Sequence, residues 1–266
     1  MKLDESVLEM DYEIIEQEIL EFIRETVAKA KAEGAVVGLS GGVDSSVVAK
    51  LCVKALGNHR VIGLLMPSEF TPMQDIDDAK ALAESLGIKT YHIPIDPIFD
   101  VFIKTLPFKT DNVVALGNIR ARTRMIINYY FANCFSYLVA GTGDRSEILI
   151  GYFTKYGDGG VDFLPTAHLY KTQVRKLGAY LGLPKKIVEK PSSPQLWKGQ
   201  RATDEIPVDY PILDLILYGM FDAKMPHSEI ARQLNVPLDL VKNVETRFLS
   251  SAHKRTIPAT VRQLFS

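Results

Sequence analysis

The sequence GLSGGVDSS, residues 38–46, joins a short β-rich apolar run (35–39) to an amphipathic helical pattern (42–56). At such a junction the first-turn N–H groups of the helix have no partner within the helix, and the helix dipole is positive, so an anion binds well. Glycine allows the backbone to approach phosphate oxygens closely, and hydroxyl donors are available from Ser40, Ser45 and Ser46. The stretch therefore predicts a phosphate-binding loop between a strand and a helix.

Asp44 places one carboxylate inside this nest of N–H groups. Phosphates would repel the carboxylate unless a cation lay between them, so we interpret Asp44 as a ligand of Mg²⁺. The alternative is a plain strand-to-helix turn that uses glycine for steric reasons and serine as a helix cap. The string lacks the lysine of G-x-x-x-x-G-K-[ST], so a Walker A loop is not indicated.

Outward from this loop, buried strands alternate with helices along the chain. Strands are expected at 35–39, 60–66, 89–95 and 136–140, and helices at 12–31, 42–56, 75–86 and 118–132. The alternation predicts an α/β fold: a doubly wound, mostly parallel sheet with helices on both faces. Ligands of such sheets bind beyond the carboxyl ends of the strands, which draws attention to the segments after Leu39 and Ala140.

The length of 266 residues fits a single α/β domain over 1–266, with a helical C-terminal part. Residues 151–166 are rich in glycine, aspartate and aromatics, and 190–211 are rich in proline. Long loops of this kind in a compact domain are usually lids or binding loops. We therefore expect both segments to border a ligand site.

Composition narrows the class of protein. Apolar residues make up 47% and charged residues 24%, and the net charge is −1, so neither a nucleic-acid partner nor a membrane partner is expected. No stretch approaches the ~18 apolar residues that span a bilayer, and no export signal is visible. The two cysteines, Cys52 and Cys134, lack a C-x-x-C spacing. We interpret Cys52 as a core residue and expect a reducing, cytoplasmic location.

A second cluster, GTGDRSE, follows the strand at 136–140 and covers residues 141–147. It lacks the third glycine of G-x-G-x-x-G, so a dinucleotide-binding Rossmann motif is not indicated. Glu147 could be a second Mg²⁺ ligand beside Asp44, or simply an acid stabilised at a helix N-terminus. The next segment, GYFTKYGDGGVD (151–162), packs cationic, hydroxyl and acidic groups into one glycine-rich loop, which is best explained by a ligand.

These motifs resemble those of the NAD⁺ synthetase family. SGGVDS (40–45) matches the S-G-G-x-D-S signature of the ATP pyrophosphatase (PP-loop) superfamily. The family resemblance adds NIRARTRM (118–125), GTGDRSE, FTKYGDGG (153–160) and the terminal His253-Lys254-Arg255, in this order over nearly the whole chain. It implies an adenine nucleotide alpha hydrolase-like fold, with a pyrophosphatase core at about 34–190 and a helical segment at about 209–266.

The resemblance also implies a set of functional residues. ATP would bind to Gly38, Leu39, Ser40, Gly41, Gly42, Val43, Asp44, Ser45, Thr142, Lys171 and Ser193. Deamido-NAD⁺ would bind to Arg122, Lys155, Asp162, His253 and Lys254, at the interface of a homodimer. Mg²⁺ would bind to Asp44 and Glu147, and Asp44 and Lys171 would serve catalysis. Ser193 stands where many members have threonine, and the neighbouring Ser192 leaves a second register open.

The implied reaction is the ATP-dependent amidation of deamido-NAD⁺ through an acyl-adenylate, which gives NAD⁺, AMP and pyrophosphate. Asp158 is our candidate to hold ammonia near the acyl carbon, although an acid in a Gly-Asp-Gly turn can also be structural. The motifs extend from residue 38 to 255 and leave no place for a glutamine-hydrolysing domain. Free ammonia is therefore the expected nitrogen source.

Three other functions are compatible with parts of the sequence. One is a different amidating or thiolating PP-loop ligase, although tRNA thiolation calls for catalytic cysteines and a basic surface. Another is a DNA-binding regulator, because residues 228–241 resemble a helix-turn-helix, yet few base-reading donors follow beyond Lys242, Asn243 and Arg247. The third is a nucleotide sensor without catalysis. Binding a nucleotide without reaction would not require the acid pair or the lysine-containing loop.

Overall fold

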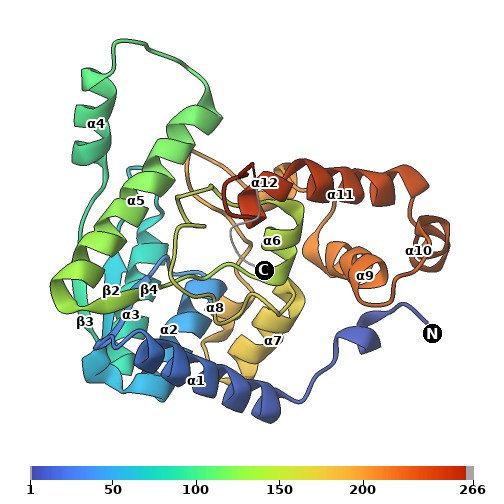
Figure 1. Ribbon diagram of the computed structural model, residues 1–266, viewed down its shortest axis with the longest axis horizontal. Coiled ribbons are helices and arrows are strands. Elements are labelled where there is room, and N and C mark those ends of the chain that lie inside the picture. Colours follow the sequence, from blue (N-terminus) through green and yellow to red (C-terminus); the bar gives the residue numbers. More distant parts are fainter. Residues whose placement is uncertain (1, 262–266) are drawn as a thin grey trace.

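The centre of the molecule is a parallel sheet, shown in Figure 1 in a computed structural model that describes residues 2–261. Its strands are β1 (Gly34–Gly38), β2 (Val61–Leu65), β3 (Lys89–His92) and β4 (Tyr137–Ala140), in the order β3-β2-β1-β4. Every pairing is parallel, and Ala35 lies opposite Val61 on one side and Leu138 on the other. The central strand β1 is buried, which explains why its sequence is apolar without alternation.

Helices cover both faces of the sheet, as predicted. One face packs against α1 (Tyr12–Lys29), α2 (Val43–Leu56), α3 (Met73–Leu86), α7 (Lys171–Tyr180) and α8 (Lys185–Val188). The opposite face packs against α5 (Val113–Phe135). Successive side chains of β1 divide between the two cores: Ala35 and Val37 belong to the first, and Val36 to the second. The doubly wound α/β fold is thereby confirmed.

A third core lies in the C-terminal helices, which gather on one side of the molecule in Figure 1. The remaining elements are the 3₁₀ turns η1 (Glu5–Leu8), η2 (Asn58–Arg60) and η3 (Ala202–Asp204), and the helices α4 (Asp96–Thr105), α6 (Arg145–Ile150), α9 (Tyr210–Phe221), α10 (His227–Leu234), α11 (Leu238–Ser250) and α12 (Ala252–Arg255). Helix α9 also packs against α6 and α7. The C-terminal core is thus joined to the part of the sheet domain that follows β4.

Several element boundaries differ from those expected. Strand β3 ends at His92 rather than residue 95: Ile93 N and Ile95 N still donate to Leu65 O and Pro67 O, but Pro67 has no N–H with which to return a bond. Helix α5 begins at Val113 rather than residue 118, since the Asn112 side chain accepts hydrogen bonds from Val114 N and Ala115 N and caps it there. Helix α4 was not expected; it begins at Asp96, directly after the shortened strand.

Two predictions about burial and membrane insertion can be compared with the structure. Cys52 is fully buried in the first core, which confirms its interpretation as a core residue, and burial raises the pKa of its thiol to about 12. Cys134 is exposed on α5. Among residues 2–261, no helix has the length and apolar character needed to cross a membrane.

Candidate active site

A cleft of about 420 Å³ opens beyond the carboxyl ends of β1, β2 and β4. Its walls come from the phosphate loop (38–45), the segment after β2, one side of α5, the loop at 151–161 and the loop at 190–197. Doubly wound sheets bind ligands at this position, because the segments that follow two neighbouring strands leave in opposite directions and open a crevice between them. Both loops that the sequence marked as binding loops therefore border the cleft.

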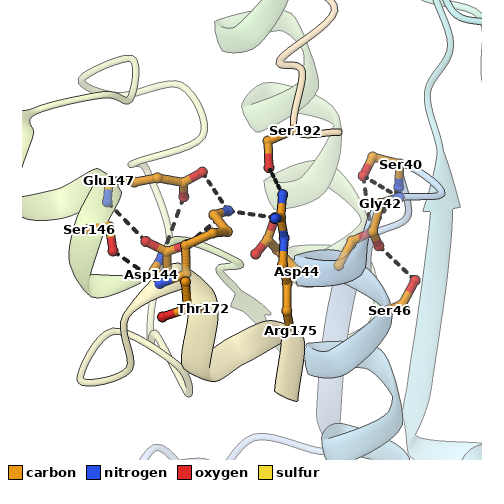
Figure 2. Close-up of polar contacts among 12 residues, drawn as sticks. Ser40, Gly42, Asp44, Ser46, Asp144, Ser146, Glu147, Thr172, Arg175 and Ser192 are labelled. Atoms are coloured by element: carbon orange, nitrogen blue, oxygen red, sulfur yellow. Dashed lines mark hydrogen bonds and ion pairs between the residues drawn. The ribbon is translucent and has the colours of Figure 1, made fainter. Parts of the chain in front are cut away.

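The phosphate loop leaves the first turn of α2 open towards the cleft. Gly42 is the N-cap of α2 and provides no side-chain cap for the first-turn N–H groups. The serine hydroxyls instead stabilise the loop itself: Ser45 Oγ accepts from Ser40 N at 3.2 Å, and Ser46 Oγ donates to Gly42 O at 2.7 Å (Figure 2). The helix N-terminus is thus held rigidly with its donors available to an anion.

The two adjacent glycines of this loop, Gly41 and Gly42, meet different requirements. Gly41 has φ +75°, and a Cβ there would lie 2.2 Å from Asp75 O, so the fold itself requires glycine. Gly42 has an extended backbone with φ −93°, and a Cβ there would meet only Ser40 Oγ, at 3.4 Å, among the described residues. Gly42 lines the cleft, so its missing Cβ leaves space for a ligand rather than for the chain.

A buried lysine joins three carboxylates, two of which line the cleft; the three acids are labelled in Figure 2. Lys171 Nζ lies 2.8 Å from Asp44 Oδ2, 2.8 Å from Asp144 Oδ2 and 2.9 Å from Glu147 Oε1. Burial works to lower the pKa of Lys171, but the three carboxylates together raise it well above its usual value. Burial and the neighbouring acids in turn raise the pKa of Glu147 well above its usual value. The cluster therefore holds more carboxylates than its single ammonium can neutralise.

This cluster has the donor chemistry of a magnesium site. Asp44 Oδ1 is buried and has no hydrogen-bond partner within residues 2–261, so a cation or a hydrogen-bond donor of a ligand would satisfy this acceptor. Asp44 and Glu147, which lie in the first turns of α2 and α6, are brought together through Lys171. No preformed group of three acidic, histidine or cysteine ligands is found in the described chain. A metal bound here would share the carboxylates with Lys171.

The residues expected to hold the second substrate lie together, mostly outside the cleft. Arg122 Nε donates to Lys155 O at 3.3 Å, and Lys155 Nζ donates to His253 O at 2.6 Å. Lys254 Nζ donates to the carbonyl oxygens of residues 151 and 153, each at 2.7 Å, and lines the cleft. Basic side chains from α5, the glycine-rich loop and α12 thus meet on one surface.

Asp162 behaves differently from the other residues of that set. Its Oδ2 accepts from Val139 N at 2.7 Å and its Oδ1 accepts from Tyr129 OH at 3.0 Å, so it braces β4 against α5. Asp158 lines the cleft with its side chain exposed, and its Oδ1 accepts from Thr154 N at 2.8 Å, the contact of a turn acid. Desolvation by the surrounding protein raises the pKa of Asp158. Asp158 therefore both forms a turn contact and faces the cleft.

The last two predicted nucleotide contacts, Thr142 and Ser193, both line the cleft. Ser193 Oγ donates to Gln200 O at 2.6 Å and so also closes its own loop. Ser192 lines the cleft as well, and its Oγ accepts from Arg175 Nη2 at 3.4 Å (Figure 2). Both registers of this segment therefore face the same space.

Comparison with known protein families identifies the chain. The family model described as NAD synthase matches residues 4–258. The chain belongs to the NAD synthase family. Its parallel sheet with helices on both faces is the fold that the resemblance led us to expect.

Similar proteins cover almost the same length. An NH₃-dependent NAD⁺ synthetase of Pyrobaculum aerophilum is 50% identical over 251 residues, which are 94% of this chain and 92% of that protein. Among solved structures, an NMN synthetase of Francisella tularensis superposes with a TM-score of 0.83 at 35% identity, covering 95% of this chain and 99% of its own. An NH₃-dependent NAD synthetase of Campylobacter jejuni follows with a TM-score of 0.80 at 31% identity, covering 96% and 100%.

Sequence reasoning missed two residues of this NAD synthase site. Asp144 forms a capping box with Glu147, whose N–H it accepts at 2.9 Å, and the D-x-x-E spacing could have revealed that cap but not its contact with Lys171. Lys190 Nζ donates to Gly41 O at 2.9 Å and pairs with Asp75 at 2.7 Å, which ties the proline-rich loop to the phosphate loop. No local signal marks Lys190, because its partners are distant in sequence.

The two glycines yield a paired prediction. Gly41→Ala should destabilise the fold by about 1–3 kcal/mol, because it forces a left-handed backbone and a clash with Asp75 O. Gly42→Ala should keep a thermal midpoint close to that of the unmodified protein and lose nucleotide affinity, since the added methyl enters the cleft. Thermal unfolding and ATP titration of both variants measure the difference. Equal ATP affinity of Gly42→Ala and the unmodified protein would contradict the assignment of this space to phosphate.

Proposed function

We propose that this chain is an NH₃-dependent NAD⁺ synthetase: it amidates deamido-NAD⁺ with free ammonia at the expense of ATP, giving NAD⁺, AMP and pyrophosphate in the final step of NAD⁺ synthesis. The observation that carries the proposal is the acid–lysine cluster beside an uncapped phosphate loop, at one end of a cleft bordered by basic residues. The NH₃-dependent NAD⁺ synthetase of P. aerophilum, which is 50% identical over nearly the whole length of both chains, supports the proposal.

The chemistry needs two displacement steps. A carboxylate oxygen of the nicotinate ring attacks the α-phosphorus of ATP, the α–β phosphoanhydride bond breaks, and pyrophosphate leaves. The nitrogen of ammonia then attacks the acyl carbon, the acyl–oxygen bond breaks, and AMP leaves with the electron pair. The N–H groups of the first turn of α2 would stabilise charge on the departing pyrophosphate. Asp158 would accept the proton that nitrogen loses, which its raised pKa favours.

The predicted nucleotide contacts of the phosphate loop, with Thr142, Lys171 and Ser193, are proposed as the ATP site, and Asp44 with Glu147 as the ligands of Mg²⁺. The buried, unpartnered Asp44 Oδ1 supports the metal assignment. Mg²⁺ would supply charge neutralisation for the phosphates. Lys171, which is already paired with both acids, would keep them oriented towards the nucleotide.

Arg122, Lys155, Asp162, His253 and Lys254 are proposed to hold deamido-NAD⁺ at a homodimer interface. Support comes from α5, where Arg122, Ile126 and Tyr130 are spaced by four residues and so share one helix face. Ile126 is 60% exposed and Tyr130 65% exposed, although apolar side chains on a long helix are usually covered. A second copy on this face would cover them and place a partner next to Arg122.

The mononucleotide is a second candidate substrate, because the F. tularensis structure that superposes with a TM-score of 0.83 is an NMN synthetase. The same two displacement steps would then act on the deamido form of the mononucleotide. The 50% identity with an NAD⁺ synthetase favours the dinucleotide. We also infer a cytoplasmic location, since both cysteines are unpaired thiols, as in proteins of reducing compartments.

The function predicts a strict set of requirements. Sustained release of pyrophosphate from ATP by the purified chain should need both deamido-NAD⁺ and NH₄⁺, because without ammonia the reaction stops after one adenylation per site, and NAD⁺ should be the product detected by mass spectrometry. Nicotinic acid mononucleotide should give a lower kcat/KM than deamido-NAD⁺ in the same assay. Glutamine in place of NH₄⁺ should support little turnover, so efficient use of glutamine would refute the assignment of ammonia as nitrogen source.

The metal assignment predicts the effect of two isosteric changes. Asp44→Asn and Glu147→Gln should each lower kcat/KM for ATP by about 100-fold, the size expected when one preorganised electrostatic contact is lost, and should raise the Mg²⁺ concentration needed for half-maximal rate. Glu84→Gln, which alters an exposed acid of α3, is the matched control. If neither site variant changes the Mg²⁺ requirement, Asp44 and Glu147 are not ligands of the metal.

The interface assignment predicts a change of mass. Sedimentation should show the unmodified protein as a dimer, and Ile126→Asp should shift it to the monomer because a charge is desolvated in an apolar contact. Ile14→Asp changes a comparably exposed isoleucine of α1, 55% exposed, and should leave the dimer intact. If the unmodified protein is a monomer, or if the Ile126→Asp variant remains a dimer, this face of α5 is not the dimer interface.

A further inference from the structure

A buried carboxylate behind the acid–lysine cluster is used by none of the steps above. Asp214 lies on α9, in the C-terminal helical segment, and is fully buried. Its Oδ1 accepts from Ser146 Oγ at 2.6 Å, and its Oδ2 accepts from Thr172 N at 2.8 Å and from Thr172 Oγ1 at 2.7 Å. One carboxylate of α9 thus holds the beginnings of α6 and α7.

Both partners of Asp214 lie next to members of the cluster. Ser146 stands between Asp144 and Glu147 in the chain, and Thr172 directly follows Lys171. Ser146 Oγ also accepts from Lys171 N at 3.0 Å, so the two helix ends are tied to each other as well as to α9. Movement of Asp214 would therefore alter the distance between the ammonium and its carboxylates.

Helix α9 also contacts Lys171 directly, one turn before Asp214. Tyr210, four residues before Asp214, is 1% exposed, and Lys171 Nζ lies 5.2 Å from the centre of its ring. Residues at i and i+4 share a helix face, so Tyr210 and Asp214 are presented together. Helix α9 thus supports the ammonium with an aromatic face and supports the neighbouring backbone with a carboxylate.

The tie formed by Asp214 requires a carboxylate rather than an amide. All of its hydrogen-bond partners are neutral, and a buried ionised carboxylate without a cationic partner costs free energy that a neutral amide would avoid. Burial raises the pKa of Asp214 to about 6, with its hydrogen bonds opposing the shift, so the group is ionised at neutral pH. Three donors point at this carboxylate, and an amide could not accept from all of them.

We propose that Asp214 is a positioning residue: through Ser146 and Thr172 it sets the first turns of α6 and α7 so that Lys171 and Glu147 are oriented for MgATP. The inference rests on the function proposed above and deepens it, since it makes the C-terminal helical segment part of the ATP site. Helix α9 contributes no atom that touches the nucleotide in this scheme. Its effect passes through the two residues to which Asp214 is bonded.

A neighbouring carboxylate offers a matched control. Asp222, at the end of α9, also bonds to the beginnings of both helices: its Oδ2 accepts from Tyr170 OH at 2.6 Å and lies 3.0 Å from Arg145 Nη2. Its side chain is 30% exposed, and its carboxylate bonds to the far ends of two long side chains, whereas Asp214 bonds to the backbone N of Thr172 and to a hydroxyl that itself accepts from Lys171 N. Asp222→Asn therefore weakens the attachment of α9 without touching Ser146 or Thr172.

The test compares Asp214→Asn, Asp222→Asn and the unmodified protein. Asp214→Asn should raise the calorimetric Kd for MgATP and lower kcat, each by about 10-fold, as for other residues that orient ligand-holding groups, and should leave KM for deamido-NAD⁺ within about 2-fold. Asp222→Asn should change none of these by more than about 2-fold, although both variants lose a tie to α9. Equal losses in the two variants, or unchanged MgATP binding by Asp214→Asn, would overturn the proposal.

Two arrangements keep the result interpretable. If Asp214→Asn does not fold, Thr172→Val removes one hydrogen bond to the intact Asp214 carboxylate, and Ser146→Ala removes one such bond together with the acceptor of Lys171 N. Both variants should weaken MgATP binding, and unchanged binding in both would overturn the proposal. MgATP titration needs no second substrate. A failure of the unmodified protein to form NAD⁺ would therefore refute the proposed function, while the comparison of the variants would still test Asp214.

Discussion

The ammonium of Lys171, held by three carboxylates, is the interaction on which the rest of the site depends. Asp44 comes from the start of α2, Asp144 and Glu147 come from the start of α6, and Lys171 starts α7. Without the lysine, three acids, one buried and two half-buried, would repel one another and separate the two helix ends. Without the acids, a buried ammonium would be unpaired. The contact therefore joins the ends of β1 and β4 into one surface.

The parallel sheet makes that contact possible. Strands β1 and β4 are neighbours in register, so the loops that follow them emerge at the same edge although about a hundred residues separate them. The phosphate loop keeps its helix N-terminus uncapped, while its serines bond to the loop itself. A rigid donor array thus lies beside a cluster with surplus negative charge. An anionic nucleotide carrying a cation satisfies both features at once.

The C-terminal helices have a core of their own and nevertheless contact the sheet domain. Helix α9 packs against α6 and α7, and α12 carries Lys254 to the cleft. The 228–241 region does fold as two successive helices, α10 and α11, but Arg247 of the second helix donates to Glu205 O at 2.6 Å. A side chain considered for reading bases is thus used to hold the proline-rich loop.

The sequence by itself determined the parallel α/β sheet, the phosphate loop and the two loops that border the cleft. These features follow from hydrophobic periodicity and from glycine and serine at a strand end, which act within a few residues. Only the tertiary structure decided that Asp144 meets Lys171, that Asp162 braces β4 and that Asp214 lies behind the cluster. Their partners lie 23 to 68 residues away. Such pairings depend on how helices pack across the finished sheet, and no local pattern encodes that packing.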